Sequence, residues 1–147
     1  MGDRYPVAVS GRRVCDDRSG LLALYVACMH RGVLDFYTGA KVLLQESVDR
    51  HHILPRDQFP DDLRATADNV ANIAFISGDV NKAISQSGPE VYLKKIANKV
   101  LESQCVPTEK NLWAIDQADA FWAARRELLA DSFNEFLKDA FPQRRLG

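Results

Sequence analysis

The stretch VDRHHILPRD, residues 48–57, contains the strongest signal for the fold of this chain. Two histidines stand side by side in it, and Ile-Leu-Pro follows them. The run before Pro55 is typical of a short strand, and proline ends such a run because it cannot donate a hydrogen bond to a sheet. Neighbouring strand residues point to opposite faces, so His51 and His52 can serve one site only where the strand ends or twists. The pair therefore predicts a strand that ends at a candidate reactive site.

The composition limits the class of protein. A chain of 147 residues is long enough for one domain with a core, and 46% hydrophobic with 27% charged residues excludes a largely disordered chain. No apolar run approaches the roughly 18 residues that a membrane span needs, and the N-terminal residues lack the apolar region of a signal peptide. We therefore expect no membrane partner.

Cysteine content and charge narrow the class further. The three cysteines include no CxxC pair, which argues against a disulfide framework or a four-cysteine zinc site and indicates a cytoplasmic protein. The net charge of −1 differs from that of domains that bind DNA by charge alone, which are strongly basic. A DNA-binding role would therefore need local positive charge or the help of another domain.

The order of elements follows from periodicity and from turn residues. The chain divides into a polar arm at 1–19, a main domain at 20–141 and a tail at 142–147. Within the main domain the pattern predicts a helix over 20–30, strands over 48–54 and 72–77, a short helix over 80–86, a helix over 89–103 and a long helix over 116–140. The centre of the chain is thus predicted to be strand, loop, strand, helix.

Two asparagines stand at defined places in this order. Asn72 opens the second strand, and Asn81 opens the helix nine residues later. A histidine pair alone is usually incidental. The ordered set of a histidine pair and two asparagines, on strand, strand and helix, is more specific.

This order resembles that of the His-Asn-His (HNH) endonucleases. The segments DRHHILP, ANIAFIS and NKAISQSGPEVYL resemble one branch in particular, the HNH domain that ends bacterial anti-phage restriction proteins of the modification-dependent, GmrSD-like kind. The similarity covers residues 20–138. It implies an α+β fold with a ββα-metal core surrounded by helices, and it identifies 20–141 as an HNH endonuclease domain that hydrolyses DNA phosphodiester bonds.

The resemblance also implies roles for the motif residues. His52 would be the general base, a task that suits an imidazole with a reference pKa of about 6.5. Asn72 would fasten the loop between the strands and so hold the ring of His52. His51 and Asn81 would bind one divalent metal ion. Two neutral ligands leave most of the coordination sphere to water and phosphate oxygens, which favours Mg²⁺ or Mn²⁺.

Some positions depart from the family pattern. Relatives often carry histidine where this chain has Asn81 and, one turn later, Ser85. Some relatives have aspartate in place of the first histidine of the pair, so Asp49, on the same strand face, is a further candidate for the metal shell. Lys82, Arg56 and Ser85 are candidates for nucleic-acid binding, with a solvated or packing role as the alternative for each.

Other residues leave alternatives open. Asn69 competes with Asn72 for the loop-fastening role. Two basic faces, either solvated or tracks for DNA, are expected from Lys94, Lys95 and Lys99 on one helix and from Arg125 and Arg126 on another. The two tryptophans, Trp113 and Trp122, are expected in the core.

The implied partners are DNA and a nucleotide-dependent N-terminal domain or partner subunit, because relatives carry such a domain and no Gly-rich phosphate loop occurs here. The chain is then a C-terminal fragment or a compact stand-alone form. Two other functions stay open: a non-catalytic HNH-like module that binds nucleic acid or protein, and a metal-dependent hydrolase of RNA or small phosphodiesters.

Overall fold

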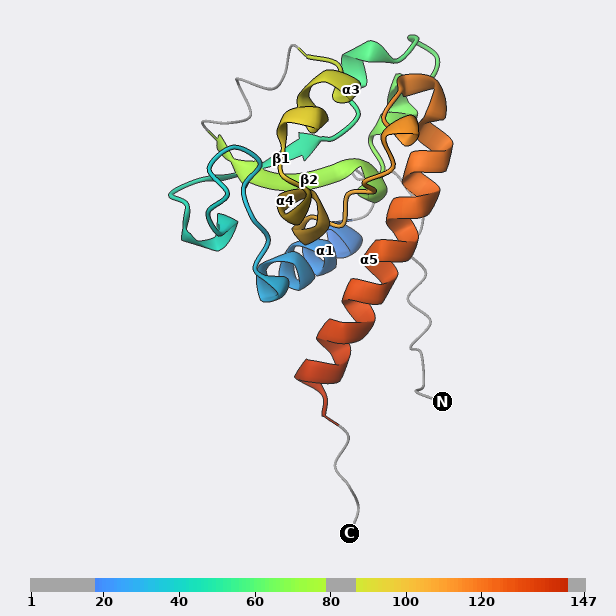
Figure 1. Ribbon diagram of the computed structural model, residues 1–147. Helices are drawn as coiled ribbons and strands as arrows, with labels where there is room; N and C mark the ends of the chain where they lie inside the picture. Colours follow the sequence, from blue (N-terminus) through green and yellow to red (C-terminus); the bar gives the residue numbers. More distant parts are fainter. Residues whose placement is uncertain (1–17, 79–86, 143–147) are drawn as a thin grey trace.

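Two antiparallel strands lie at the centre of the fold in the computed structural model, which describes residues 18–78 and 87–142 (Figure 1). Strand β1 (Val48–His52) pairs with β2 (Ile73–Ser77), with His52 opposite Ile73 and Val48 opposite Ser77. Every residue of β2 is buried, as expected for a short apolar run bounded by polar segments. The two strands packed with helices confirm the predicted α+β class.

Helices cover the two-stranded sheet. Helix α1 (Arg18–Arg31) packs against the long C-terminal helix α5 (Ala118–Ala140), which runs down one side of the molecule in Figure 1. Two short helices, α3 (Pro89–Tyr92) and α4 (Asn98–Ser103), lie on either side of the strands in the same view. The predicted first and last helices are thus present with slightly different bounds.

The core has two parts. One surrounds the end of β1 and includes Ile53, Leu54, Tyr92 and both tryptophans, so the prediction that Trp113 and Trp122 are core residues is confirmed. The other lies between α1, α5 and the strands and is centred on the side chains Leu24, Cys28, Phe75, Leu129 and Phe133. The end of β1 is therefore held by dense packing.

The predicted continuous helix over 89–103 is wrong. Helix α3 tightens into the 3₁₀ turn η5 (Leu93–Lys95), the backbone is extended at Ile96 and Ala97, and α4 then begins. Tyr92, Leu93, Ile96 and Val100 are all buried, so the helical spacing of apolar residues continues across the break and could not reveal it. Lys94, Lys95 and Lys99 are exposed but do not share one helix, which corrects the predicted basic face.

The connection between β1 and β2 consists of loops and 3₁₀ turns, as its prolines and aspartates predict. The turns are η2 (Arg56–Gln58), η3 (Arg64–Ala67) and η4 (Val70–Asn72). In the part of the chain that the structure describes, three further 3₁₀ turns lie elsewhere: η1 (Val42–Leu44), η6 (Lys110–Leu112) and η7 (Ile115–Gln117). The predicted helix over 80–86 lies outside the described residues.

Across 18–78 and 87–142, no helix is both long enough and apolar enough to cross a membrane.

Candidate functional site

Strand β1 ends at the second histidine of the pair. The backbone N–H of Ile53 donates to the carbonyl of Asn72 at 2.8 Å, and the chain then leaves the sheet. His51 is 5% exposed, whereas the side chain of His52 is 35% exposed. The strand therefore ends two residues before its predicted end at Leu54, and the two rings have different surroundings, as expected for neighbours on a strand.

Asn72 joins the two ends of the connection between the strands. Its side chain is fully buried, and its Oδ1 accepts the backbone N–H of Leu54 at 2.9 Å. Its Nδ2 donates to the carbonyl of Leu54 at 3.0 Å and to that of Ala67 at 2.9 Å. The loop-fastening contacts expected of Asn72 are present, while its part in catalysis stays a prediction.

Asn69 makes a more local contact. Its Nδ2 donates to the carbonyl of Thr66 at 2.7 Å, three residues earlier in the same turn. That bond braces the turn, whereas the bonds of Asn72 reach back to the end of β1. The geometry therefore favours Asn72 over Asn69 for the loop-fastening role.

His52 belongs to a group of three side chains. Its Nε2 lies 2.9 Å from Oδ1 of Asp68, and Nε of Arg56 lies 3.5 Å from Oδ2 of the same carboxylate. Because a carboxylate accepts and does not donate, a neutral His52 ring donates through Nε2–H and carries its lone pair on Nδ1. Asp68 can thus orient the ring and stabilise the imidazolium that would form on protonation.

Asp68 was not among the site residues predicted from the sequence. Sixteen residues separate it from His52, and no motif spacing connects the two. A structural link does exist, because Asp68 follows Ala67, whose carbonyl is bound by Asn72. Asn72 therefore fixes the backbone next to the carboxylate that contacts His52.

His51 lies in an aromatic pocket on the buried side of β1. Its ring packs edge-on against Phe36 and Tyr92, with centroid separations of 6.0 and 5.7 Å. Its Nε2 lies 3.2 Å from the hydroxyl oxygen of Tyr92, and that hydroxyl donates to the carbonyl of Ile53. Burial raises the pKa of Tyr92, so the hydroxyl keeps its proton. Tyr92, which is 41 residues away from His51, was not among the site residues predicted from the sequence.

Asp49 lies on the same face of β1 as His51, two residues earlier. A Cβ atom placed on Gly78 would lie 3.5 Å from Oδ2 of Asp49, so this carboxylate is next to the residue that follows β2. Segment 79–86 continues from there and lies outside the described residues, together with the predicted site residues Asn81, Lys82 and Ser85. Their roles stay predictions.

The donors of this strand face suit a particular kind of metal ion. His51 offers an imidazole and Asp49 a carboxylate, a nitrogen and oxygen set that suits Mn²⁺ and, with water and phosphate oxygens added, Mg²⁺. Among the residues that the structure describes, no group of three or more His, Cys, Asp or Glu side chains could hold a metal ion. A complete site would therefore need donors such as the amide of Asn81, water or substrate oxygens.

Arg125 corrects the second predicted basic face. The guanidinium is fully buried, with Nη1 donating to the carbonyl of Ala71 at 2.8 Å and Nη2 to that of Gln104 at 3.1 Å. Arg126 is partly exposed. Arg125 is thus a core residue that braces the turn carrying Asn72, and it is not part of a track for DNA.

A buried carboxylate supports the far end of the strands. Oδ1 of Asp35 accepts the backbone N–H of Ser77 at 2.7 Å, and Oδ2 accepts N–H groups of Tyr37 and Thr38 and the Thr38 hydroxyl. Burial alone would raise the pKa of Asp35, but these hydrogen bonds outweigh it and leave the pKa below its ordinary value. This contact holds the end of β2, immediately before Gly78.

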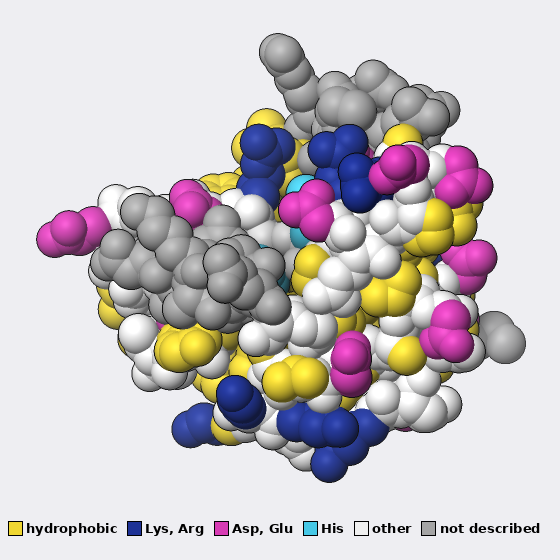
Figure 2. Space-filling view, turned by 90° about the horizontal axis from the view of Figure 1, so that it is seen from above, with side chains coloured by type: hydrophobic (Ala, Val, Ile, Leu, Met, Phe, Trp, Pro, Cys, Tyr) yellow, Lys and Arg dark blue, Asp and Glu magenta, His cyan; other side chains and the backbone are white. Residues whose placement is uncertain are grey.

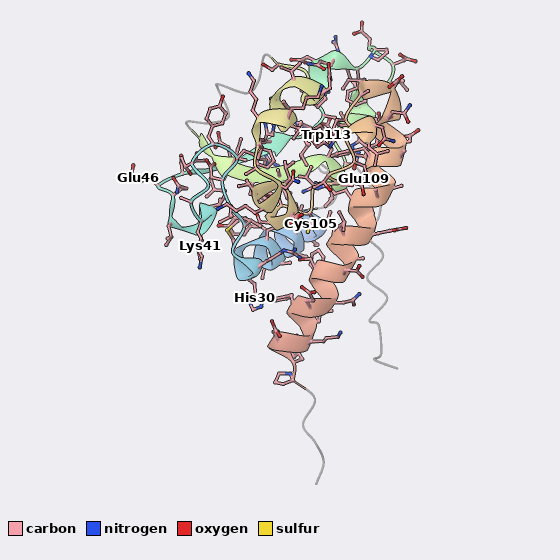
Figure 3. All side chains as sticks on the ribbon, in the orientation of Figure 1. His30, Lys41, Glu46, Cys105, Glu109 and Trp113 are labelled. Atoms are coloured by element: carbon pink, nitrogen blue, oxygen red, sulfur yellow. The ribbon has the colours of Figure 1, made fainter. Side chains whose placement is uncertain are left out.

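The surface around the histidine pair carries mixed charge. Figure 2 shows histidine side chains set back between basic and acidic side chains on this face. Arg56, half exposed beside Asp68, contributes a cation there. His30 is separate from this group: Figure 3 shows it beside the lower part of α5, and its Nε2 lies 3.1 Å from Oδ2 of Asp139.

Comparison of the chain with models of protein families, with curated proteins and with solved structures found no match.

Proposed function

We propose that this chain is a metal-dependent DNA endonuclease of the HNH type, with a ββα-metal core, and that it is the nuclease part of a bacterial restriction or anti-phage defence system. The observation that carries the proposal is the environment of His52. The ring lies at a partly exposed strand end, bound to Asp68, in a connection that Asn72 fastens on both sides.

His52 would act as the general base. With Nε2–H donated to Asp68, Nδ1 is the atom that would take a proton from the attacking water. Asp68 would stabilise the imidazolium formed in that step, and Arg56 would hold the other oxygen of the carboxylate in place. Hydroxide attack on the phosphorus would then displace the 3′ oxygen of the scissile bond.

His51 and Asn81 would hold one divalent ion, Mg²⁺ or Mn²⁺, with Asp49 joining directly or through water. When bound, such an ion stabilises charge on the phosphate and on the leaving oxygen. The nitrogen and oxygen donors of the β1 face fit this chemistry.

The substrate is DNA in this proposal, with little sequence preference from the domain itself. Arg56, Lys82 and Ser85 would contact phosphates. The net charge of −1 supports a partner for target binding, either a nucleotide-dependent N-terminal domain or another subunit. A hydrolase of RNA or small phosphodiesters and a non-catalytic binding module are the two alternatives.

A supercoiled-plasmid assay with Mg²⁺ or Mn²⁺ tests the proposal. We would compare wild type, His52→Ala and the matched control His30→Ala, with EDTA added in a parallel series. Metal-dependent loss of supercoiled DNA in wild type and His30→Ala, but not in His52→Ala, supports an endonuclease with His52 as its base. If His52→Ala cleaves the plasmid as well as wild type does, His52 is not the general base.

The same preparations decide between the alternatives. Cleavage of RNA or of a chromogenic phosphodiester with plasmid left intact would favour the other hydrolase. Absence of all cleavage, combined with DNA or protein binding, would favour the binding module. The ratio of open-circle to linear product reports nicking against double-strand cutting.

A further inference from the structure

A chain of two hydrogen bonds connects His51 to the backbone just beyond the strand. Nε2 of His51 lies 3.2 Å from the hydroxyl oxygen of Tyr92, and that hydroxyl donates its proton to the carbonyl of Ile53. All three residues lie in the core, with exposed fractions of 5% or less.

The direction of these bonds determines where the proton of the imidazole lies. A tyrosine hydroxyl has one proton, and a backbone carbonyl can only accept. Because that proton is donated to Ile53, the oxygen of Tyr92 can only accept from His51. Nε2 of His51 must therefore carry hydrogen, and the lone pair of the neutral ring is on Nδ1.

The surrounding packing restricts the ring further. Phe36 and Tyr92 both contact the ring of His51 edge-on, from different elements of the fold. Flipping the imidazole about its Cβ–Cγ bond would place the carbon atom Cε1 where Nε2–H now meets the Tyr92 oxygen. An unsatisfied buried donor or acceptor would result, which is unfavourable.

We infer that Tyr92 is a positioning residue for His51, one that fixes the Nε2–H tautomer and so makes Nδ1 the atom with which His51 binds a divalent cation. The part of the inference that concerns metal binding by His51 rests on the proposed function. The part that concerns the tautomer of His51 depends only on the hydrogen bonds described above.

Nitrogen NMR tests the tautomer directly. Long-range ¹H–¹⁵N spectra of the metal-free full chain, recorded above the reference pKa of histidine, show which ring nitrogen carries hydrogen. The chain has three histidines, so His30→Gln and His52→Gln assign the signal of His51. We expect hydrogen on Nε2 in wild type. Any other proton distribution would overturn the inference.

Tyr92→Phe keeps the ring contacts and removes the hydroxyl, and Tyr37→Phe is the matched control because Tyr37 is exposed. We expect the Nδ1–H form to gain population in Tyr92→Phe and to stay unchanged in Tyr37→Phe. A His51 spectrum that is identical in both variants and in wild type would refute the role of Tyr92.

Mn²⁺ affinity, measured by calorimetry on the metal-free variants, tests the part that concerns metal binding. Loss of an outer partner of a metal-binding histidine weakens metal affinity by about 10- to 100-fold, which is the effect we expect for Tyr92→Phe. His51→Ala tests whether His51 is a metal ligand separately from which tautomer its ring adopts. If Mn²⁺ binds wild type and His51→Ala equally, His51 is not a ligand and the part that concerns metal binding fails, while the NMR result still decides the tautomer.

Discussion

His52 Nε2 and Asp68 Oδ1 lie 2.9 Å apart, although 16 residues separate them in the chain. The contact depends on Asn72, which binds the carbonyl of Ala67 and so fixes the backbone immediately before Asp68. A carboxylate in this place gives the ring a defined tautomer and a counter-charge when it is protonated.

Asp68→Asn is expected to slow DNA cleavage by at least about 10-fold, while His52→Ala removes the full contribution of general-base catalysis, about 10²- to 10⁴-fold. The amide keeps the size of the side chain but loses the charge that stabilises the imidazolium. The measurement is the initial rate of open-circle formation at saturating metal. Asp61→Asn is the matched control, because Asp61 is exposed in the same connection and pairs with Arg64. Equal rates for the two variants would show that Asp68 has no role in turnover.

Asn72→Ala is expected to lower the free energy of unfolding by about 3 kcal/mol, because three hydrogen bonds are lost and the groups that they satisfied stay buried. Asn69→Ala removes a single hydrogen bond to Thr66 and should cost about 1 kcal/mol. Urea denaturation of both variants measures the difference. Similar losses would mean that the connection does not depend on Asn72 in the way its contacts indicate.

The sequence predicted the local elements better than the contacts between them. The strand with the histidine pair was expected over 48–54 and is Val48–His52, and the last helix was expected over 116–140 and is Ala118–Ala140. Both depend on local patterns of apolar residues. The break at Ile96 was missed because apolar spacing is the same on either side of it.

The contacts of the candidate site could be predicted only in part. The family resemblance picked out His52 and Asn72, and the structure shows the hydrogen bonds that fasten the loop. Asp68 and Tyr92 were missed because they come from distant segments, and no local spacing encodes such pairs. Arg125 was placed on the surface because a charged residue type gives no sign of the buried carbonyls that it binds.

Asp35→Asn is expected to change how stability depends on pH. The pKa of Asp35 is below its ordinary value in the folded state, so the ionised carboxylate stabilises the fold at pH values above the unfolded pKa of about 3.9. This contribution is lost as the pH falls through the folded pKa. The stability difference between wild type and Asp35→Asn should therefore be constant near neutral pH and shrink below about pH 4.

Urea denaturation between pH 3 and 7 measures that difference. Thr38→Val removes one of the donors to Asp35 and should show the same dependence on pH with a smaller amplitude. A difference that is independent of pH would show that the charge of Asp35 does not contribute to stability.

Arg56→Ala is expected to weaken DNA binding and to reduce its salt dependence. Arg56 is half exposed beside the carboxylate that contacts His52. The proposed function gives it a contact with a DNA phosphate there. Losing one phosphate contact should lower the slope of log K against log salt by about 1. Removing the cation also leaves the charge of Asp68 uncompensated, which repels DNA further.

The measurement is fluorescence anisotropy with duplex DNA at several salt concentrations, in a His52→Ala background without added metal, so that no cleavage occurs. Arg64→Ala is the matched control: Arg64 is similarly exposed in the same connection and, like Arg56, pairs with an aspartate, in its case Asp61. We expect the control to keep the wild-type slope. If both variants change the slope of log K against log salt equally, positive charge acts over the whole surface, and Arg56 makes no specific contact with a phosphate.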